Sequence, residues 1–103
     1  PCVVSSALET SVGLAAQLAL AGALPELDFA CGLGTLSLLR GDVVPDTDSL
    51  RPVEGYLPVP RTPIAADPAL LDVHELTDHQ QATWWRNRLR RVHAKLNANT
   101  PTG

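Results

Sequence analysis

Two short segments of the sequence could contact a ligand: a serine pair and a glycine-rich run, each directly after an apolar stretch. Their residues are Ser5, Ser6, Gly32, Leu33 and Gly34. A serine pair at the start of a helix presents backbone N–H groups that favour an anion. Glycines let a loop bring its own N–H groups close to one. Structure alone also explains both segments, because a serine caps a helix and glycines turn the chain, so the pattern by itself leaves both interpretations open.

No group suited to proton transfer is expected beside these segments. Catalytic proton abstraction needs a His, Lys, Asp or Glu in a cleft. Glu26 and Asp28 lie at the entry of the second expected strand, which is its opposite end, and the only lysine, Lys95, is far along the chain. Glu9 fits the S-x-x-E capping box that Ser6 begins. We therefore predict no catalytic residue in this chain.

A metal site is not expected from the histidines and cysteines. His74, His79 and His93 do not lie three or four residues apart, and the two cysteines, Cys2 and Cys31, are distant from each other. These spacings do not fit a zinc site. We predict no metal ligand in the chain.

A basic, tryptophan-containing segment near the end of the chain has two possible roles. Trp84 and Trp85 are followed by Arg86, Arg88, Arg90 and Arg91. Aromatic and basic residues together can bind nucleic acid, but an amphipathic helix whose basic end complements its dipole explains them too. Because the net charge is -3, we favour the second role, with Trp85 packed inward and Trp84 half-exposed, and predict no nucleic-acid partner.

The elements that must position the two ligand-contacting segments are predicted in residues 1–40. Strands are expected over Cys2–Ser5 and Leu27–Cys31, a helix over Ala7–Ala23 between them, and one or two helical turns over Leu36–Arg40 after the glycine loop. Strand, helix and strand form a right-handed parallel unit. Parallel strands are buried on both faces, and this chain supplies too little to cover them, so we expect further strands from elsewhere.

The rest of the chain divides into two parts. Residues 41–66 are rich in proline and predict an extended segment over Val53–Val59. In residues 67–103, Asp67 and Pro68 begin a short helix as N-cap and first helical residue. A last helix begins at Thr77 or Asp78 and reaches about Leu96, with one apolar stripe along it and a polar tail over residues 97–103. The stripe consists of Trp85, Leu89, Val92 and Leu96.

Composition narrows the class of protein. The chain has 103 residues, 45% of them hydrophobic, but no apolar run approaches the roughly 20 residues of a membrane span. Both cysteines lie in apolar runs, which favours buried, reduced thiols and a cytoplasmic location. The chain contains no methionine and begins inside an expected strand. We therefore expect a cytoplasmic fragment with no membrane partner.

Several runs of the sequence are similar to one enzyme family. Val3–Leu14 resembles the region around the seventh barrel strand of the o-succinylbenzoate synthases, which belong to the enolase superfamily. Leu24–Asp28 and Ala30–Thr35 resemble the eighth strand and its loop in the actinobacterial branch. Pro52–Val59 resembles the segment that returns to the capping domain, and Trp84-Trp85 resembles part of a late helix.

This resemblance implies a fold and a reaction. The fold would be the C-terminal part of a modified (β/α) TIM barrel, with its last two strands and crossover helix in residues 1–40. Residues 41–66 would pack on an α+β capping domain, and residues 67–103 would form helices and a tail. The family removes water from 2-succinyl-6-hydroxy-2,4-cyclohexadiene-1-carboxylate to give o-succinylbenzoate in menaquinone biosynthesis.

The resemblance also assigns roles. In the family, one lysine abstracts the proton, a second stabilises the enediolate, and three acidic residues hold Mg²⁺. None has a counterpart in this chain, so Mg²⁺ would be bound by residues outside it and the chain alone would be inactive. Ser5, Ser6, Gly32, Leu33 and Gly34 match positions that face the substrate, especially its succinyl carboxylate. The expected partners are this small carboxylate and the rest of the chain's own barrel and capping domain.

Two alternatives remain. A racemase of N-acylamino acids or an epimerase of dipeptides would use the same scaffold, and the residues that distinguish it lie mostly upstream. A small non-catalytic interaction domain would use the basic tryptophan helix. That domain would fold alone with a cooperative transition, whereas a fragment would fold poorly without its covering strands.

Overall fold

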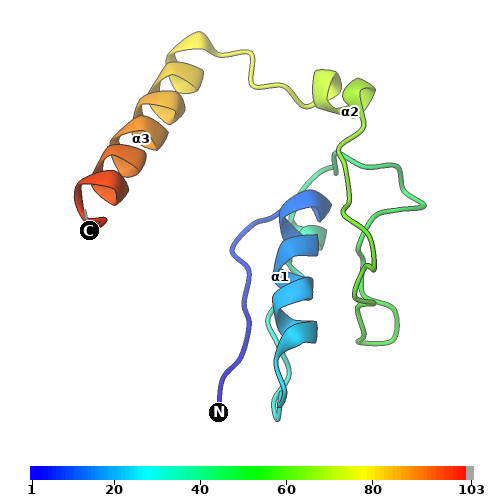
Figure 1. Ribbon diagram of the computed structural model, residues 1–103. Coiled ribbons are helices and arrows are strands. Elements are labelled where there is room, and N and C mark those ends of the chain that lie inside the picture. The colour runs from blue at the N-terminus through cyan, green and yellow to red at the C-terminus, as the bar shows by residue number, and fades with distance from the viewer. Residues whose placement is uncertain (102–103) are drawn as a thin grey trace.

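The computed structural model describes residues 1–101, and within that range the regular structure is helical (Figure 1). The helices are α1 (Ser11–Ala23), the 3-10 helix η1 (Thr35–Leu38), α2 (Pro68–Val73) and α3 (His79–Ala98). The polar tail predicted from residue 97 therefore begins later, because α3 continues to Ala98. Residues 102 and 103 of that tail lie outside the described residues.

The two expected strands are reduced to a single point of pairing. Ser5 and Gly32 form a parallel bridge, and the Ser6 N–H donates to the Gly32 carbonyl at 2.9 Å. The parallel direction of the two segments is as predicted, but no continuous ladder forms among residues 1–101. A pair of parallel strands needs neighbours on both sides and cover on both faces, and the described chain provides neither.

Helix α1 begins four residues later than the sequence predicts. The expected capping box does not form, because the Ser6 hydroxyl contacts Gly32 and Thr35 instead of the helix N-terminus. Thr10 occupies the N-cap position without a side-chain hydrogen bond. The prediction that Ser6 stands at a helix N-terminus, with an anion favoured by that helix's dipole, is therefore wrong.

A buried carboxylate from another part of the chain takes over the capping of α1. Asp42 accepts hydrogen bonds from the Ser11 N–H at 2.9 Å and from the Ser11 hydroxyl, and from the Ser49 hydroxyl at 2.7 Å. Ser11 in turn accepts from the Leu50 N–H at 2.9 Å. This network, the Asp42 network, satisfies an N–H of the first turn that the helix itself cannot and places negative charge at the positive end of its dipole.

The hydrogen bonds also set the charge state of Asp42. Burial alone would raise the pKa of its carboxyl group, but the donors from Ser11, Ser49 and Val43 outweigh it and hold the pKa below its usual value of 3.8. Asp42 is 7% exposed and Ser11 is fully buried. A buried carboxylate of this kind is stable because both of its oxygens accept hydrogen bonds.

The hydrophobic core lies on one face of α1. Leu14 and Leu18 pack there, while Val12 and Leu20 on other faces are 37% and 56% exposed. The buried residues of α1 are Ser11, Leu14, Leu18 and Ala21. The core cluster consists of Val4, Leu14, Leu18, Ala21, Leu33, Leu36 and Leu50.

The proline-rich segment turns rather than continuing as one extended stretch. Val53 and Tyr56 form an antiparallel bridge with hydrogen bonds in both directions. Between them Glu54 and Gly55 have φ values of 52° and 81°, as in a tight turn with both central residues in the left-handed region. The prediction of a single extended segment over Val53–Val59 is wrong at its first half.

The two C-terminal helices begin where the sequence predicts. The Asp67 carboxylate accepts from the Ala69 N–H at 2.8 Å, and Pro68 is the first residue of α2. Asp78 accepts from the N–H groups of Gln80 and Gln81 at 2.9 and 3.1 Å. Each carboxylate satisfies N–H groups of the first turn, as N-cap residues do.

Helix α3 lies apart from α1 and contributes no buried residue (Figure 1). Trp84 and Trp85 pack edge to face with ring centroids 4.7 Å apart, and the Arg88 guanidinium lies 5.6 Å from the Trp84 ring. Trp85 is 57% exposed, so the prediction that it packs inward is wrong. The described chain has a radius of gyration of 16.4 Å, against about 13 Å for a compact domain of 100 residues.

Two further predictions from composition can be compared with the structure. Cys2 is exposed and Cys31 half-buried, both as free thiols, so the expected burial of both is wrong for Cys2. Across residues 1–101, none of the helices combines the length and the apolar character that crossing a membrane requires.

Candidate functional site

The structure brings the serine pair and the glycine loop together, although 26 residues separate Ser6 from Gly32. The Ser5–Gly32 bridge sets the two backbones side by side, and the Gly32 carbonyl accepts the Ser6 N–H at 2.9 Å. The Ser6 hydroxyl also approaches that carbonyl at 3.4 Å. These residues, together with Leu33, Gly34 and Thr35, are called the Ser–Gly site below.

Thr35 joins the site and was not singled out in the sequence. Its hydroxyl lies 2.7 Å from the Ser6 hydroxyl, which makes this the shortest contact between the two segments. Both residues are half-buried. The sequence does show a hydroxyl residue directly after the second glycine, which could have marked Thr35 as a site residue. It does not show that this hydroxyl faces Ser6.

Gly32 and Gly34 differ in how much space surrounds the position of a Cβ atom. A Cβ added at Gly32 would lie 3.1 Å from the Ser5 Oγ, which is tight, whereas one at Gly34 would meet only the Pro52 side chain at 3.4 Å, an ordinary contact. Both glycines are exposed. Within residues 1–101 the Gly34 N–H has no hydrogen-bond acceptor. Gly34 therefore offers a free donor on an open surface.

Leu33 takes a different part from the one the sequence suggested. Its side chain is 5% exposed and belongs to the core cluster. Its N–H donates to the Cys31 carbonyl at 3.0 Å. Leu33 thus anchors the loop to the core, and its side chain is not available to a ligand in this structure.

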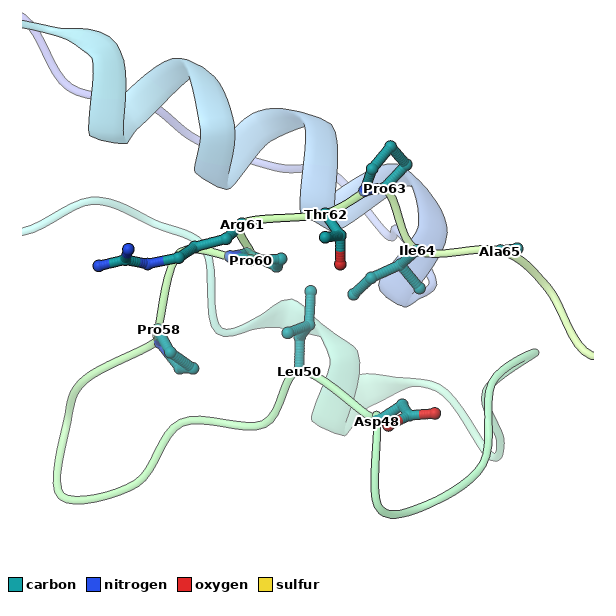
Figure 2. Close-up of a pocket in the computed structure, with 9 residues that line it drawn as sticks. All are labelled: Asp48, Leu50, Pro58, Pro60, Arg61, Thr62, Pro63, Ile64 and Ala65. Atoms are coloured by element: carbon teal, nitrogen blue, oxygen red, sulfur yellow. The ribbon is translucent and has the colours of Figure 1, made fainter.

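Two pockets of the described chain lie away from the Ser–Gly site. One, of about 390 Å³, is formed by the 58–65 segment with Asp48 and Leu50. Figure 2 shows Leu50 and Ile64 pointing into this space and the Arg61 guanidinium pointing away from it. The other, of about 380 Å³, lies between the 60–64 segment and α1. The lining of the second pocket is largely apolar, and neither pocket contains Ser5, Ser6 or the glycines.

The chemistry available at the Ser–Gly site is hydrogen-bond donation. The hydroxyl pair of Ser6 and Thr35, together with the free Gly34 N–H, can donate to an anion such as a carboxylate. Ser5, Ser6, Thr35 and the glycines include no acid, base or lysine. Asp42, the one buried carboxylate among residues 1–101, already accepts hydrogen bonds from Ser11, Ser49 and Val43. Over residues 1–101, His, Cys, Asp and Glu side chains nowhere gather in a group of three that could hold a metal ion.

Comparison with known proteins identifies relatives of this chain. The o-succinylbenzoate synthase of Mycobacterium leprae is 45% identical over 96 residues, which is 93% of this chain. The chain is homologous to part of the o-succinylbenzoate synthases. Those of Mycobacterium tuberculosis and Thermobifida fusca are 46% identical over 96 residues and 63% identical over 65 residues, respectively. The resemblance drawn from the sequence is thus confirmed.

The matches cover only a portion of each o-succinylbenzoate synthase. They span 27% of the Mycobacterium leprae protein and 20% of the Thermobifida fusca protein. The chain therefore spans about a quarter of the length of the curated relatives it matches. No protein-family model matches the chain.

Proposed function

We propose that this chain is the C-terminal part of an o-succinylbenzoate synthase, a dehydratase of menaquinone biosynthesis. The reaction would remove water from 2-succinyl-6-hydroxy-2,4-cyclohexadiene-1-carboxylate to form o-succinylbenzoate. The observation that carries this proposal is the 45% identity that extends over 93% of the chain to a protein of that name. Homology over nearly the whole chain favours the same enzyme over an unrelated interaction domain.

Within that enzyme, the Ser–Gly site is proposed to position the succinyl carboxylate. The substrate is an anion, and the site combines the hydrogen-bonded hydroxyl pair of Ser6 and Thr35 with a free backbone donor at Gly34. Charge-assisted hydrogen bonds to a carboxylate are stronger than those between neutral groups. Such contacts hold the substrate without taking part in bond breaking, so they act mainly on its affinity.

The acid–base and metal chemistry is proposed to come from residues outside this chain. The carboxylates and imidazoles of residues 1–101 do not form a group that fits Mg²⁺, and the only lysine, Lys95, is on α3. We place the Mg²⁺ ligands and the two lysines on other strands of a modified TIM barrel. The last two strands of that barrel would be the segments that meet at Ser5 and Gly32, with α1 crossing between them.

The test is steady-state kinetics of the enzyme that contains this chain, with Gly34→Val as the main variant. A valine side chain would fill the open surface beside the Gly34 N–H, while φ of −89° at this residue accepts any side chain. We expect KM to rise about tenfold or more, from loss of a hydrogen bond to a charged group. The kcat/KM ratio falls accordingly, and the Mg²⁺ concentration for half-maximal activity stays unchanged.

Two further variants complete this test. Gly32→Val should raise KM as well, with an added effect on folding because its Cβ crowds the Ser5 hydroxyl at 3.1 Å. Leu38→Val is the control, since Leu38 is 71% exposed at the end of η1. An unaltered KM in Gly34→Val would contradict the proposal that the substrate binds at this site.

A further inference from the structure

The hydroxyl groups of Ser6 and Thr35 form one hydrogen bond with each other, which leaves one of their two hydroxyl hydrogens free. Two hydroxyls carry two O–H hydrogens, and only one of them can lie in the 2.7 Å hydrogen bond between the two oxygens. The second is left for another acceptor. Where it goes determines what the pair can bind.

The acceptor nearest to Ser6 is a weak one. The Ser6 hydroxyl lies 3.4 Å from the Gly32 carbonyl, which is beyond the usual range of an O–H···O hydrogen bond. That carbonyl already accepts the Ser6 N–H at 2.9 Å. The arrangement that uses all these contacts has Thr35 donating to the Ser6 oxygen and the Ser6 hydrogen only loosely held by Gly32.

A carboxylate ligand would be a better acceptor than this carbonyl. Hydrogen bonds to a carboxylate are shorter and stronger than those to a neutral acceptor, so the Ser6 O–H would turn to a bound anion. Donation from Thr35 polarises the Ser6 hydroxyl and strengthens the bond that Ser6 itself donates. Both residues are half-buried, and the contact between their hydroxyls is part-buried.

We propose that Thr35 is a positioning residue for substrate binding, whose hydroxyl donates to Ser6 and so directs the Ser6 O–H at the substrate carboxylate. This inference rests on the proposed function of the Ser–Gly site. It adds a residue to that site and assigns the direction of the hydrogen bond between its two segments. Thr35 itself acts through Ser6 and makes no bond to the reacting atoms.

The test replaces Thr35 in the complete enzyme at saturating Mg²⁺. Thr35→Val keeps the shape of the side chain and removes its hydroxyl, and Thr35→Ser keeps the hydroxyl. We expect Thr35→Val to raise KM about tenfold, by loss of one oriented hydrogen bond to a charged group, with kcat within about twofold. Thr35→Ser should return KM to within about twofold of the unmodified enzyme, which a purely packing role of the threonine methyl group would not do.

A pair of variants tests whether the two hydroxyls act as one unit. Ser6→Ala should raise KM as much as Thr35→Val or more, and the double variant should be no worse than Ser6→Ala alone, because residues that act together are not additive. Thr35→Ala serves as a second hydroxyl deletion should the valine variant fail to fold. Calorimetric binding of the product, o-succinylbenzoate, should weaken by the same factor as KM rises.

Several results would overturn the proposal. They are an unchanged KM in Thr35→Val or Thr35→Ala, equal impairment in Thr35→Ser, or fully additive effects of the Ser6 and Thr35 changes. Gly34→Val separates this from failure of the proposed function. A raised KM in Gly34→Val together with a normal KM in Thr35→Val would contradict only the role of Thr35. A normal KM in both variants would contradict the proposal that the Ser–Gly site binds the substrate carboxylate.

Discussion

Residues 1–65 and helix α3 of this chain are stabilised in opposite ways. The first region has a core cluster, a buried hydrogen-bond network and contacts between segments far apart in sequence. Helix α3 has a capping aspartate and a 20-residue length, and all of its apolar stripe is more than half exposed. Each region nevertheless contains an amphipathic or apolar helix, α1 in the first and α3 in the second. The difference shows that helical pattern decides whether a helix forms, while packing partners decide whether it is buried.

The same comparison separates the two kinds of candidate function. The Ser–Gly site depends on contacts between segments, since Ser6, Gly32 and Thr35 meet only through the fold. The tryptophans and arginines of α3 are a local surface whose residues are neighbours in sequence. Homology to o-succinylbenzoate synthases extends over 93% of the chain and so includes parts of both regions. The predictions below test how sharply the two regions differ.

The largest difference is expected from one substitution made in each region. Leu14→Ala in α1 removes a side chain that is 0% exposed, and should lower the free energy of unfolding by about 2–5 kcal/mol. Leu89→Ala in α3 removes one that is 70% exposed, and should change it by no more than about 0.5 kcal/mol. Urea denaturation of the protein that contains this chain measures both. Equal costs would contradict the exposed position of α3 and show that its stripe is covered by another part of the protein.

The Asp42 network should be the next most sensitive feature. Asp42→Ala leaves the Ser11 and Ser49 hydroxyls and two buried N–H groups without their acceptor, and each such loss costs about 1–3 kcal/mol. We expect a total destabilisation of at least about 2 kcal/mol in the same denaturation experiment. Asp46→Ala, an exposed acid in the same loop, is the matched control and should change little. Comparable results from the two variants would mean that Asp42 does not cap α1.

The charge of Asp42 predicts a dependence of stability on pH. Because the pKa of its carboxyl group is lower in the folded chain than its usual 3.8, the folded state releases this proton more readily than the unfolded state. Its contribution to stability is therefore present above pH 3.8 and is lost as the pH falls through the folded-state pKa. Urea midpoints measured from about pH 5 down to about pH 2 should show this loss, and Asp42→Asn should reduce it. If Asp42→Asn lost as much stability at low pH as the unmodified protein, the lowered pKa of Asp42 would be contradicted.

The smallest effect is expected at the start of α3. Asp78→Ala removes the acceptor for the N–H groups of Gln80 and Gln81 and should cost about 1 kcal/mol of helix stability. Because α3 is not packed against α1, the loss should appear as faster amide exchange in residues 79–83 and not in α1. Glu75→Ala, an exposed acid without a capping bond, is the control. Faster exchange in α1 as well would show that the two regions are coupled.

The parts of the fold that depend on neighbouring residues were predictable from the sequence. Asp67, Pro68 and Asp78 carry their capping chemistry within two or three residues, and both C-terminal helices begin there. The start of α1 was not predictable in this way, because its cap is Asp42, 31 residues away. Ser6 fits a local capping box, but a contact with Thr35 competes with it and prevails.

The candidate site was predictable to the same extent. The serine pair and the glycine loop were identified from residue types, and the parallel arrangement of their strands placed them together. The inward direction of the Leu33 side chain and the part of Thr35 depend on how the loop sits on the core. A sequence contains no local signal for either. The apolar faces of α1 and α3 do not show from sequence which residues, if any, pack against them. For this reason the apolar stripe of α3 led to the prediction that Trp85 packs inward.

The most direct measurement of the central claim is the formation of o-succinylbenzoate by the protein that contains this chain, with and without the Gly34→Val change. The account predicts Mg²⁺-dependent product formation by the unmodified protein. In the variant it predicts KM raised about tenfold or more, with the Mg²⁺ requirement unchanged. Product formation with an unaltered KM in Gly34→Val would contradict the Ser–Gly site. Absence of product, with racemisation of N-acylamino acids in its place, would contradict the proposed reaction.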